Sequence, residues 1–412
     1  MTHPSLLWER PTRVREELAG CNAAIEDATG EAVKWFRPPF GARRPPNSAI
    51  ESCQESLSGI LDQDGDGGMI RDRPIVVAGA GSIGCFVGGM LAAAGARVAV
   101  LARPRVIQEI QGHGLRLTSF EGFERQIASN QLTLSEDPRI LADAGVVLVT
   151  VKSADTPGIA DLIARHAPSD TVVVSLQNGI GNATVLRERL PGRRVLAAMV
   201  PFNVVAPAPG RFHRATSGDI IVENDDAGTA ARLSVPGLTM RPSADIAGVQ
   251  WGKLLVNLNN ALNALCGLPL REQLAQRAWR RLFADQIAEG LAAIKAEGIR
   301  PVSTTPIPLS WLPHLLRLPD AVFAVLLGRT MKIDPEARSS MWEDLQRGRR
   351  TEIDYLQGVI TEIADRRRLQ VPLSRRVKAL ITRAEATGQG SPKLTPDQVR
   401  SDLQVGSDFI KH

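Results

Sequence analysis

The apolar positions between residues 74 and 199 follow two alternating patterns. Short β-branched runs predict strands at 75–78, 98–101, 146–151, 171–175 and 194–199. Stretches with helical spacing predict helices at 83–94, 104–111, 155–166 and 183–190. Strands and helices that alternate in this way indicate a parallel sheet with right-handed crossovers.

The pattern changes twice beyond this region. Between 200 and 241 the apolar runs are shorter, with turn signals at 207–210 and 225–228, and we expect antiparallel strands that close the sheet. Helical spacing then predicts helices at 253–265, 274–297, 341–367 and 373–386, and a helix at 308–327 that Pro313 and Pro319 break or kink. The chain therefore reads as an α/β domain followed by an all-α domain, with a ligand cleft between them.

Residues 1–68 show no sustained period and predict a poorly ordered extension or linker. They carry seven Lys and Arg against eleven Asp and Glu, whereas the whole chain has a net charge of +5. The tract at 62–68 opens like a calcium-binding loop, but Arg73 stands where a bidentate Glu is needed. We expect folding to start at Met69, with domains at 69–244 and 245–390 and a tail at 391–412.

Composition excludes several classes of protein. With 43% hydrophobic and 23% charged residues, the 412-residue chain is typical of a globular protein. No Lys/Arg run is interleaved with aromatic residues, so we expect no nucleic-acid partner. The uncharged stretch 74–96 is long enough to cross a bilayer, but its six glycines favour a buried strand and a packed helix. The four cysteines and six histidines lack metal-ligand spacing, which predicts no metal site and a cytoplasmic protein with free thiols.

The first strand runs directly into a glycine-rich loop. Its sequence GAGSIG comprises Gly79, Ala80, Gly81, Ser82, Ile83 and Gly84. A strand before this motif, a helix after it and a second strand within about 30 residues form the context of a dinucleotide-binding loop. The alternative, a glycine-rich turn that binds nothing, is less favoured because the whole context is present.

The residue at the end of the second strand indicates which dinucleotide binds. An NAD site places Asp or Glu there for the ribose hydroxyls, but this chain has Arg103, with Arg105 two residues later. A guanidinium can bind a 2′-phosphate bidentately, so the sequence favours NADPH. The alternative, an ordinary surface arginine, fits Arg105 better than Arg103.

Six segments together resemble the ketopantoate reductase (2-dehydropantoate 2-reductase) family. They are GAGSIG at 79–84, LAR at 101–103, VTVKS at 149–153, QNGIGN at 177–182, WGKLLVNLNNALNAL at 251–265 and SSMWEDLQRGRRTEIDYLQG at 339–358. The resemblance implies a Rossmann-type domain followed by a helical domain like that of 6-phosphogluconate dehydrogenase. It also implies NADPH-dependent reduction of 2-dehydropantoate to (R)-pantoate, a step of pantothenate and coenzyme A biosynthesis.

The resemblance also assigns roles to single residues. Lys253 corresponds to the general acid and Glu352 to its carboxylate partner. Ser340 corresponds to a contact of the substrate carboxylate, and Asn257 to a substrate-binding amide. Asn178 and Lys152 correspond to groups near the nicotinamide and near the ribose or the substrate.

The chain departs from the family pattern at one position. The family commonly has a second asparagine eight residues after the lysine, where this chain has Ala261. Asn260 is the best substitute, since a residue seven positions on stays on the lysine's helical face. This departure weakens the assignment of 2-dehydropantoate as substrate more than it weakens the reaction type.

The residues themselves also favour a polar cleft. Lys253, Asn257 and Asn260 share one stripe of a predicted helix, and asparagine is costly in helices, so the stripe favours function over a solvated face. Burial would deprotonate a lysine, and a carboxylate such as Glu352 would restore the proton. The alternative for Glu352 is a surface pair with Arg349. We interpret the arginine clusters 280–281, 347–350 and 366–368 as solvated faces.

Two other functions stay open at this point. The first is a reductase of the same fold that acts on another branched 2-keto acid. The second is a non-catalytic NADPH-binding sensor, which would leave Lys253, Asn257, Ser340 and Glu352 without a purpose. The partner in the leading interpretation is a small 2-keto acid, and the protein is a monomer or homodimer.

Overall fold

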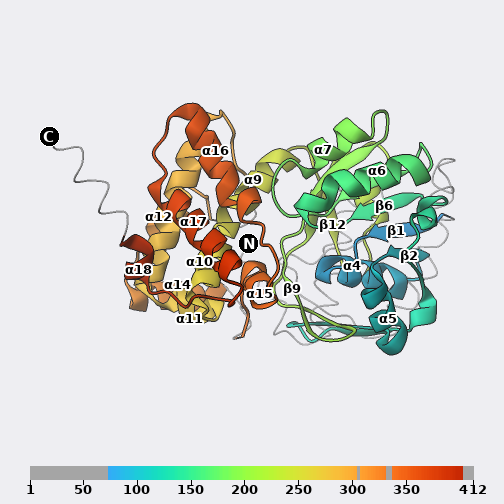
Figure 1. The fold of residues 1–412 in the computed structure, drawn as a ribbon, viewed down its shortest axis with the longest axis horizontal. Coiled ribbons are helices and arrows are strands. Elements are labelled where there is room, and N and C mark those ends of the chain that lie inside the picture. The colour runs from blue at the N-terminus through green and yellow to red at the C-terminus, as the bar shows by residue number, and fades with distance from the viewer. Residues whose placement is uncertain (1–72, 304–306, 331–335, 402–412) are drawn as a thin grey trace, which may run out of the picture. The chain divides into compact units, whose positions relative to one another are not determined.

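A computed structural model describes residues 73–303, 307–330 and 336–401 of the chain. Its main sheet has eight strands in the order β12-β11-β8-β7-β6-β1-β2-β5 (Figure 1). The strands are β1 Ile75–Ala78, β2 Val98–Leu101, β5 Leu132–Ser135, β6 Val146–Val149, β7 Val172–Ser175, β8 Val195–Met199, β11 Ile220–Glu223 and β12 Met240–Ser243. Adjacent strands pair in parallel except β8 with β11. The predicted α/β architecture is confirmed.

The helices of this part of the chain follow the predicted order. They are α4 Ser82–Ala93, α5 Pro104–His113, α6 Thr156–His166, α7 Asn182–Arg189 and the short α8 Thr229–Arg232, with 3₁₀ turns η2 Ser129–Gln131, η3 Pro138–Leu141 and η4 Ser153–Asp155. The first four start and end within two residues of the predicted bounds. All four residues of β2, β6 and β7 are buried, as expected for parallel strands covered on both faces. The uncharged stretch 74–96 is therefore β1 and α4, and no described helix is long and apolar enough to span a bilayer.

A second sheet was not predicted. It has the order β4-β3-β10-β9, with β3 Leu115–Ser119, β4 Glu124–Ile127, β9 Val204–Ala208 and β10 Arg211–Arg214. The expectation that strands in 200–241 close the main sheet is confirmed for β11, which pairs antiparallel with β8, but β9 and β10 instead join β3 and β4. The signal was weak, since β4 buries Ile127 alone of its four residues.

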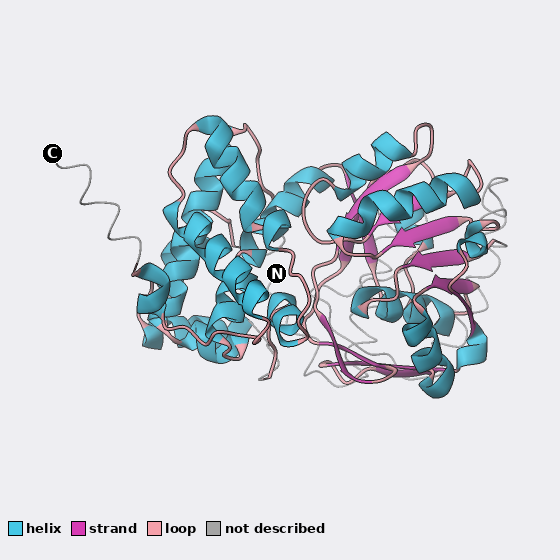
Figure 2. Cartoon of the chain, in the orientation of Figure 1, coloured by secondary structure: helices cyan, strands magenta, loops and turns pink. Residues whose placement is uncertain are grey.

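The chain after β12 is helical throughout its described part (Figure 2). Its helices are α9 Ile246–Asn257, α10 Asn259–Cys266, α11 Leu270–Ala275, α12 Arg277–Ala296, α13 Leu312–Leu316, α14 Asp320–Thr330, α15 Ser340–Gln346, α16 Gln357–Arg367, α17 Pro372–Thr387 and α18 Pro396–Arg400, with the 3₁₀ turn η5 Ile353–Tyr355. The helix expected at 308–327 is divided into α13 and α14, and the predicted break at Pro319 is confirmed. Pro313 does not break a helix, because it lies in the first turn of α13. Val399 of α18 is fully buried, so the expected tail at 391–412 packs on the helical domain at least through α18.

Three predicted helices are divided in the structure. The helix at 253–265 breaks at Leu258 between α9 and α10, and the one at 274–297 breaks at Gln276. The helix expected at 341–367 ends at Gln346, and Gly348 (φ 59°) turns the chain before Glu352. Glu352 therefore lies on an irregular segment and not on a continuous surface helix.

Arg280 corrects the interpretation of one arginine cluster. Its side chain is fully buried, and the guanidinium donates to the carbonyls of Leu274, Leu316 and Leu318 and lies 4.1 Å from the Phe323 ring centroid. In contrast, Arg366 and Arg367 pair with Glu297 at the surface, as predicted.

Candidate active site

Four of the positions predicted for the site follow the carboxyl ends of parallel strands of the main sheet: Arg103 after β2, Gly79 after β1, Lys152 after β6 and Asn178 after β7. Pro201, which was not predicted, follows β8 in the same way. We call these five positions the sheet-edge row. Because β1 pairs with β2 on one side and β6 on the other, the chain reverses its order at β1, the point where open α/β sheets bind ligands.

The glycine loop after β1 has the geometry of a phosphate cradle. A Cβ on Gly79 (φ +108°) would lie 2.7 Å from a Val151 methyl, and a Cβ on Gly84 would lie 2.2 Å from the Gly79 carbonyl oxygen. A Cβ on Gly81 would meet no atom within 4 Å, so the backbone is open to a ligand there. Ser82 and Ile83 then begin α4, whose first N–H groups are available to an anion. These residues fit a dinucleotide.

Arg103 precedes α5 as its N-cap residue and extends into solvent. Its side chain is 88% exposed, and its ion pair with Asp155 is long, at 4.0 Å. Arg105 instead pairs with Glu109 one turn along α5 at 3.1 Å. Of the two arginines, Arg103 has the more available guanidinium.

Lys152 joins the α/β and helical parts of the chain. Its ammonium lies 2.8 Å from the Asp344 carboxylate of α15 and donates to the Arg350 carbonyl at 2.8 Å. Burial raises the pKa of Asp344, and the positive charge of Lys152 opposes that rise. The sequence analysis missed Asp344, although it lies within the 339–358 segment that carries the resemblance.

Glu352 reaches the same edge from the helical side. The Ser153 hydroxyl donates to Glu352 Oε1 at 3.4 Å, and the Asn178 side chain also hydrogen-bonds this carboxylate. Burial raises the pKa of Glu352, and Lys152 opposes the rise. The charged neighbours of Glu352 are therefore Lys152 and Asp344, and the described structure contains no ion pair between Glu352 and Lys253. The expected direct partnership with Lys253 is corrected on this point, as is the surface pair with Arg349.

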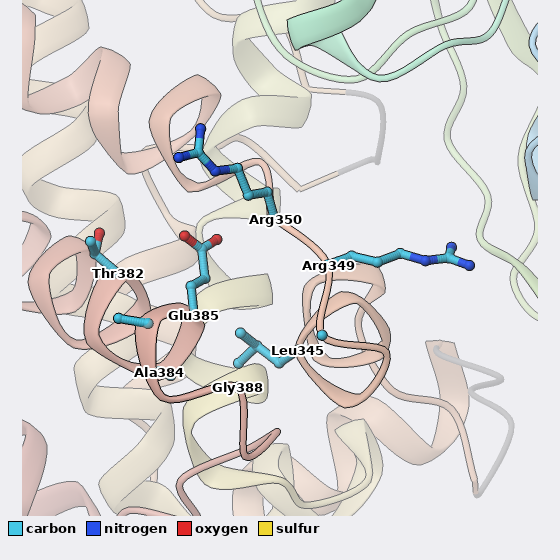
Figure 3. Close-up of a pocket in the computed structure, with 9 residues that line it drawn as sticks. Leu345, Arg349, Arg350, Thr382, Ala384, Glu385 and Gly388 are labelled. Carbon is cyan, nitrogen blue, oxygen red and sulfur yellow. The ribbon is translucent and has the colours of Figure 1, made fainter.

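The segment that carries Glu352 also contacts α17. The Thr351 amide donates to Glu385 Oε1 at 2.7 Å. A cavity of about 330 Å³ lies beside this contact, and Figure 3 shows Arg350 above the Glu385 carboxylate while Arg349 points away from it. The position of Glu352 thus depends on contacts with Ser153 after β6, with Asn178 after β7 and with α17.

Lys253 lies on α9 beside the end of β8. Its ammonium donates to the Pro201 carbonyl at 3.1 Å, and one turn earlier Gln250 donates to the Ala198 carbonyl at 3.0 Å. Burial lowers the pKa of Lys253 from 10.5 to about 8. A lysine with this pKa releases a proton readily near neutral pH.

The asparagines of α9 and α10 divide into two groups. Asn257 is buried and Asn260 half-buried on the side that continues from Lys253. Asn259 and Asn263 instead hydrogen-bond Gln273, and Asn263 also accepts from the Ser339 amide. Asn259 and Asn263 therefore have a structural purpose, and their cost in a helix is no sign of function.

Ser340 is exposed at the start of α15, and its neighbour Ser339 fixes that position. The Ser339 hydroxyl donates to the Asn260 carbonyl at 2.9 Å and also caps α15 by accepting from the Trp342 amide. The turn that carries Ser340 is thus attached to α10, seven residues beyond Lys253.

Comparison of the sequence with known protein families identifies the family of this chain. Residues 75–226 match the family described as ketopantoate reductase PanE/ApbA, and residues 245–385 match its C-terminal domain. The chain belongs to the ketopantoate reductase family. A separate match, to the family described as polysaccharide deacetylase, covers residues 1–54, which lie outside the described residues.

Several relatives extend over nearly their full length. A 2-dehydropantoate 2-reductase from Halobacterium salinarum is 30% identical, covering 76% of this chain and 99% of the relative. The crystal structure of a PanE/ApbA family ketopantoate reductase from Ralstonia eutropha is 32% identical with a TM-score of 0.65, covering 77% of this chain and 99% of that one. The structure of D-mandelate dehydrogenase with NADH and anilino(oxo)acetate has a TM-score of 0.63 at 21% identity, covering 76% of this chain and 99% of that one, which shows a shared fold. The chain is therefore an oxidoreductase of this family with a Rossmann-type domain and a helical domain.

Proposed function

We propose that the protein reduces the keto group of a 2-keto acid with NADPH, with 2-dehydropantoate as the first candidate substrate and (R)-pantoate as the product. The order of the sheet-edge row supports this proposal most directly. The glycine loop follows β1, and the Pro201 carbonyl that accepts from Lys253 follows β8. These two strands are three strand spacings apart, about 14 Å. An extended dinucleotide with its pyrophosphate on the loop can cover that span.

The cofactor would supply a hydride to the keto carbon. The residues that would hold it are Gly79, Gly81, Ser82, Ile83 and Gly84 at the phosphates, Arg103 at the 2′-phosphate, and Lys152 and Asn178 towards the ribose and nicotinamide. Arg103 supports NADPH over NADH, because its exposed guanidinium occupies the position where an NAD site has an acidic residue.

The remaining residues act on the substrate. Lys253 would donate the proton to the carbonyl oxygen, where negative charge develops as the hydride arrives. Asn257, Asn260, Asn178 and Ser340 would hold the substrate. Glu352 hydrogen-bonds Ser153 and Asn178 and would hold the loops after β6 and β7 in place. Its carboxylate would also attract the positive charge of Lys152.

A second candidate substrate is another branched 2-keto acid. Ala261 is fully buried in α10, so this position offers no amide to a distal hydroxyl of the substrate. The (R)-pantoate reaction in pantothenate and coenzyme A synthesis is thus one possibility within the reaction class. The third interpretation, a non-catalytic NADPH sensor, gives no reason for the low pKa of Lys253.

A substrate panel tests the proposal. Oxidation of NADPH or NADH is followed by absorbance with 2-dehydropantoate and other 2-keto acids, for the wild type and Lys253→Met. We expect turnover with NADPH and a loss of about 10²–10⁴-fold in the variant. Cofactor binding without turnover of any keto acid would support the sensor interpretation instead.

A further inference from the structure

A second cavity lies between the α/β part and the helical part of the chain. It has a volume of about 260 Å³. One wall is β9 and the start of the loop after β10, and the other is α15 with the turn before it. The apolar side chains that line it are Val205, Ala206, Pro207, Ala215, Ala337 and Trp342. We call it the β9–α15 pocket.

Both walls continue segments that already hold site residues. Pro201, whose carbonyl accepts from Lys253, lies three residues before β9 begins at Val204. On the other wall, Ser339 is bonded to the Asn260 carbonyl, and Trp342 follows Ser340 by two residues. Asn260 lies seven residues beyond Lys253, across the break between α9 and α10. Both walls of the pocket are therefore close along the chain to residues of the candidate site.

The charges at the rim of the pocket are compensated by one another. Glu343 pairs with Arg347 at 3.7 Å, and Arg338 pairs with Glu336 at 3.7 Å while its guanidinium lies 4.7 Å from the Trp342 ring centroid. A charged ligand group would have to compete with these pairs, whereas an apolar group would contact aliphatic and indole surface. The chemistry of the pocket thus favours an apolar occupant.

We propose that the β9–α15 pocket binds the non-reacting side chain of the keto acid and that Trp342 and Val205 determine the size of the pocket. This inference rests on the proposed function and narrows its substrate class. The substrate class is a 2-keto acid with a bulky apolar side chain, either aromatic or branched aliphatic. Ala261 agrees with this class, because it provides no hydrogen-bonding group for a polar side chain.

The test fills the pocket from an edge strand. Val205 is half-buried on β9 and lines the pocket from the face opposite the buried Val204, so Val205→Phe adds four carbons to the pocket. The kcat/KM for phenylpyruvate and 4-methyl-2-oxopentanoate is expected to fall about tenfold or more, while that for pyruvate stays within about twofold. Val322→Phe, the same change at an exposed position of α14, is the matched control and should alter neither.

A second variant removes the aromatic wall. Trp342→Ala should weaken turnover of phenylpyruvate more than that of pyruvate, and Trp342→Phe should recover part of the difference. If Val205→Phe lowered kcat/KM equally for large and small keto acids, or for neither, the pocket would not hold the side chain. A wild-type protein that reduces no member of the panel would instead contradict the proposed function itself, so the two failures are distinguishable.

Discussion

Burial of Lys253 should make the protein less stable and, at the same time, make this lysine a stronger acid. The fold lowers the pKa of this lysine from 10.5 to about 8, with burial as the cause. Each pKa unit corresponds to about 1.4 kcal/mol, so the charged ammonium costs up to about 3 kcal/mol of folding free energy at neutral pH. Lys253→Met removes that cost, and we expect it to stabilise the protein while lowering kcat by about 10²–10⁴-fold.

The sign of the pH dependence follows from the same shift. Below pH 8 the lysine is protonated in both the folded and the unfolded state, so the full cost is present. Between pH 8 and 10.5 the folded state releases its proton first, and the free energy of unfolding rises with pH. The stability advantage of Lys253→Met should therefore shrink across this window, as measured by urea unfolding of both proteins at several pH values.

Activity should fall over the pH range in which the free energy of unfolding rises. The protonated lysine is the proton donor, so kcat/KM for keto acid reduction should be constant below pH 8 and fall tenfold per pH unit above it. Because burial and not Glu352 sets this pKa, Glu352→Gln should leave the alkaline limb in place. Lys295→Met, at an exposed position of α12, is the matched control and should not change the profile. An alkaline limb near pH 10, or a stability gap that does not vary with pH, would refute the assignment.

Three further predictions concern other parts of the chain. Arg103→Ala should weaken NADPH binding about ten- to a hundredfold by calorimetry and leave NADH binding unchanged, while Arg105→Ala should change neither; equal losses for both cofactors would make Arg103 structural. Arg280→Met should lower the free energy of unfolding by about 3 kcal/mol or more in urea, since it leaves buried carbonyls without donors, whereas Arg281→Met at the exposed neighbour should have little effect. A chain that starts at Met69 should keep its melting temperature and activity, and insoluble protein after this truncation would contradict the prediction.

The elements that could be predicted are those whose hydrophobic pattern along the chain matches their burial in the fold. The strands β1, β2, β6, β7 and β8 are almost wholly buried, so their apolar runs are visible in the sequence, whereas β5 is only partly buried and was not predicted. The break between α9 and α10 was not visible, because it depends on a distant partner. Gln357, fully buried, donates to the Leu258 carbonyl at the break between α9 and α10 from 99 positions away. No periodicity contains that information.

The candidate residues show the same limit. The glycine loop and Arg103 were predictable because a cofactor site is built from neighbours in sequence, in a fixed order after two strands. The environment of Glu352 was not, because it depends on β6, β7, α15 and α17 together. The domain bounds and the roles of the site residues stay predictions.

The separation of Lys253 from Glu352 has a chemical advantage that the sequence did not suggest. The phase of α9 is fixed by its N-cap Asp245, which accepts from the Gly248 amide, and by Gln250 on the Ala198 carbonyl. The lysine then lies one turn on, where the neutral Pro201 carbonyl accepts a hydrogen bond from its ammonium. A carboxylate in that place would raise the pKa of Lys253 and make it a weaker acid. Because a general acid works best with a pKa near the working pH, burial beside a carbonyl suits proton donation better than an ion pair would.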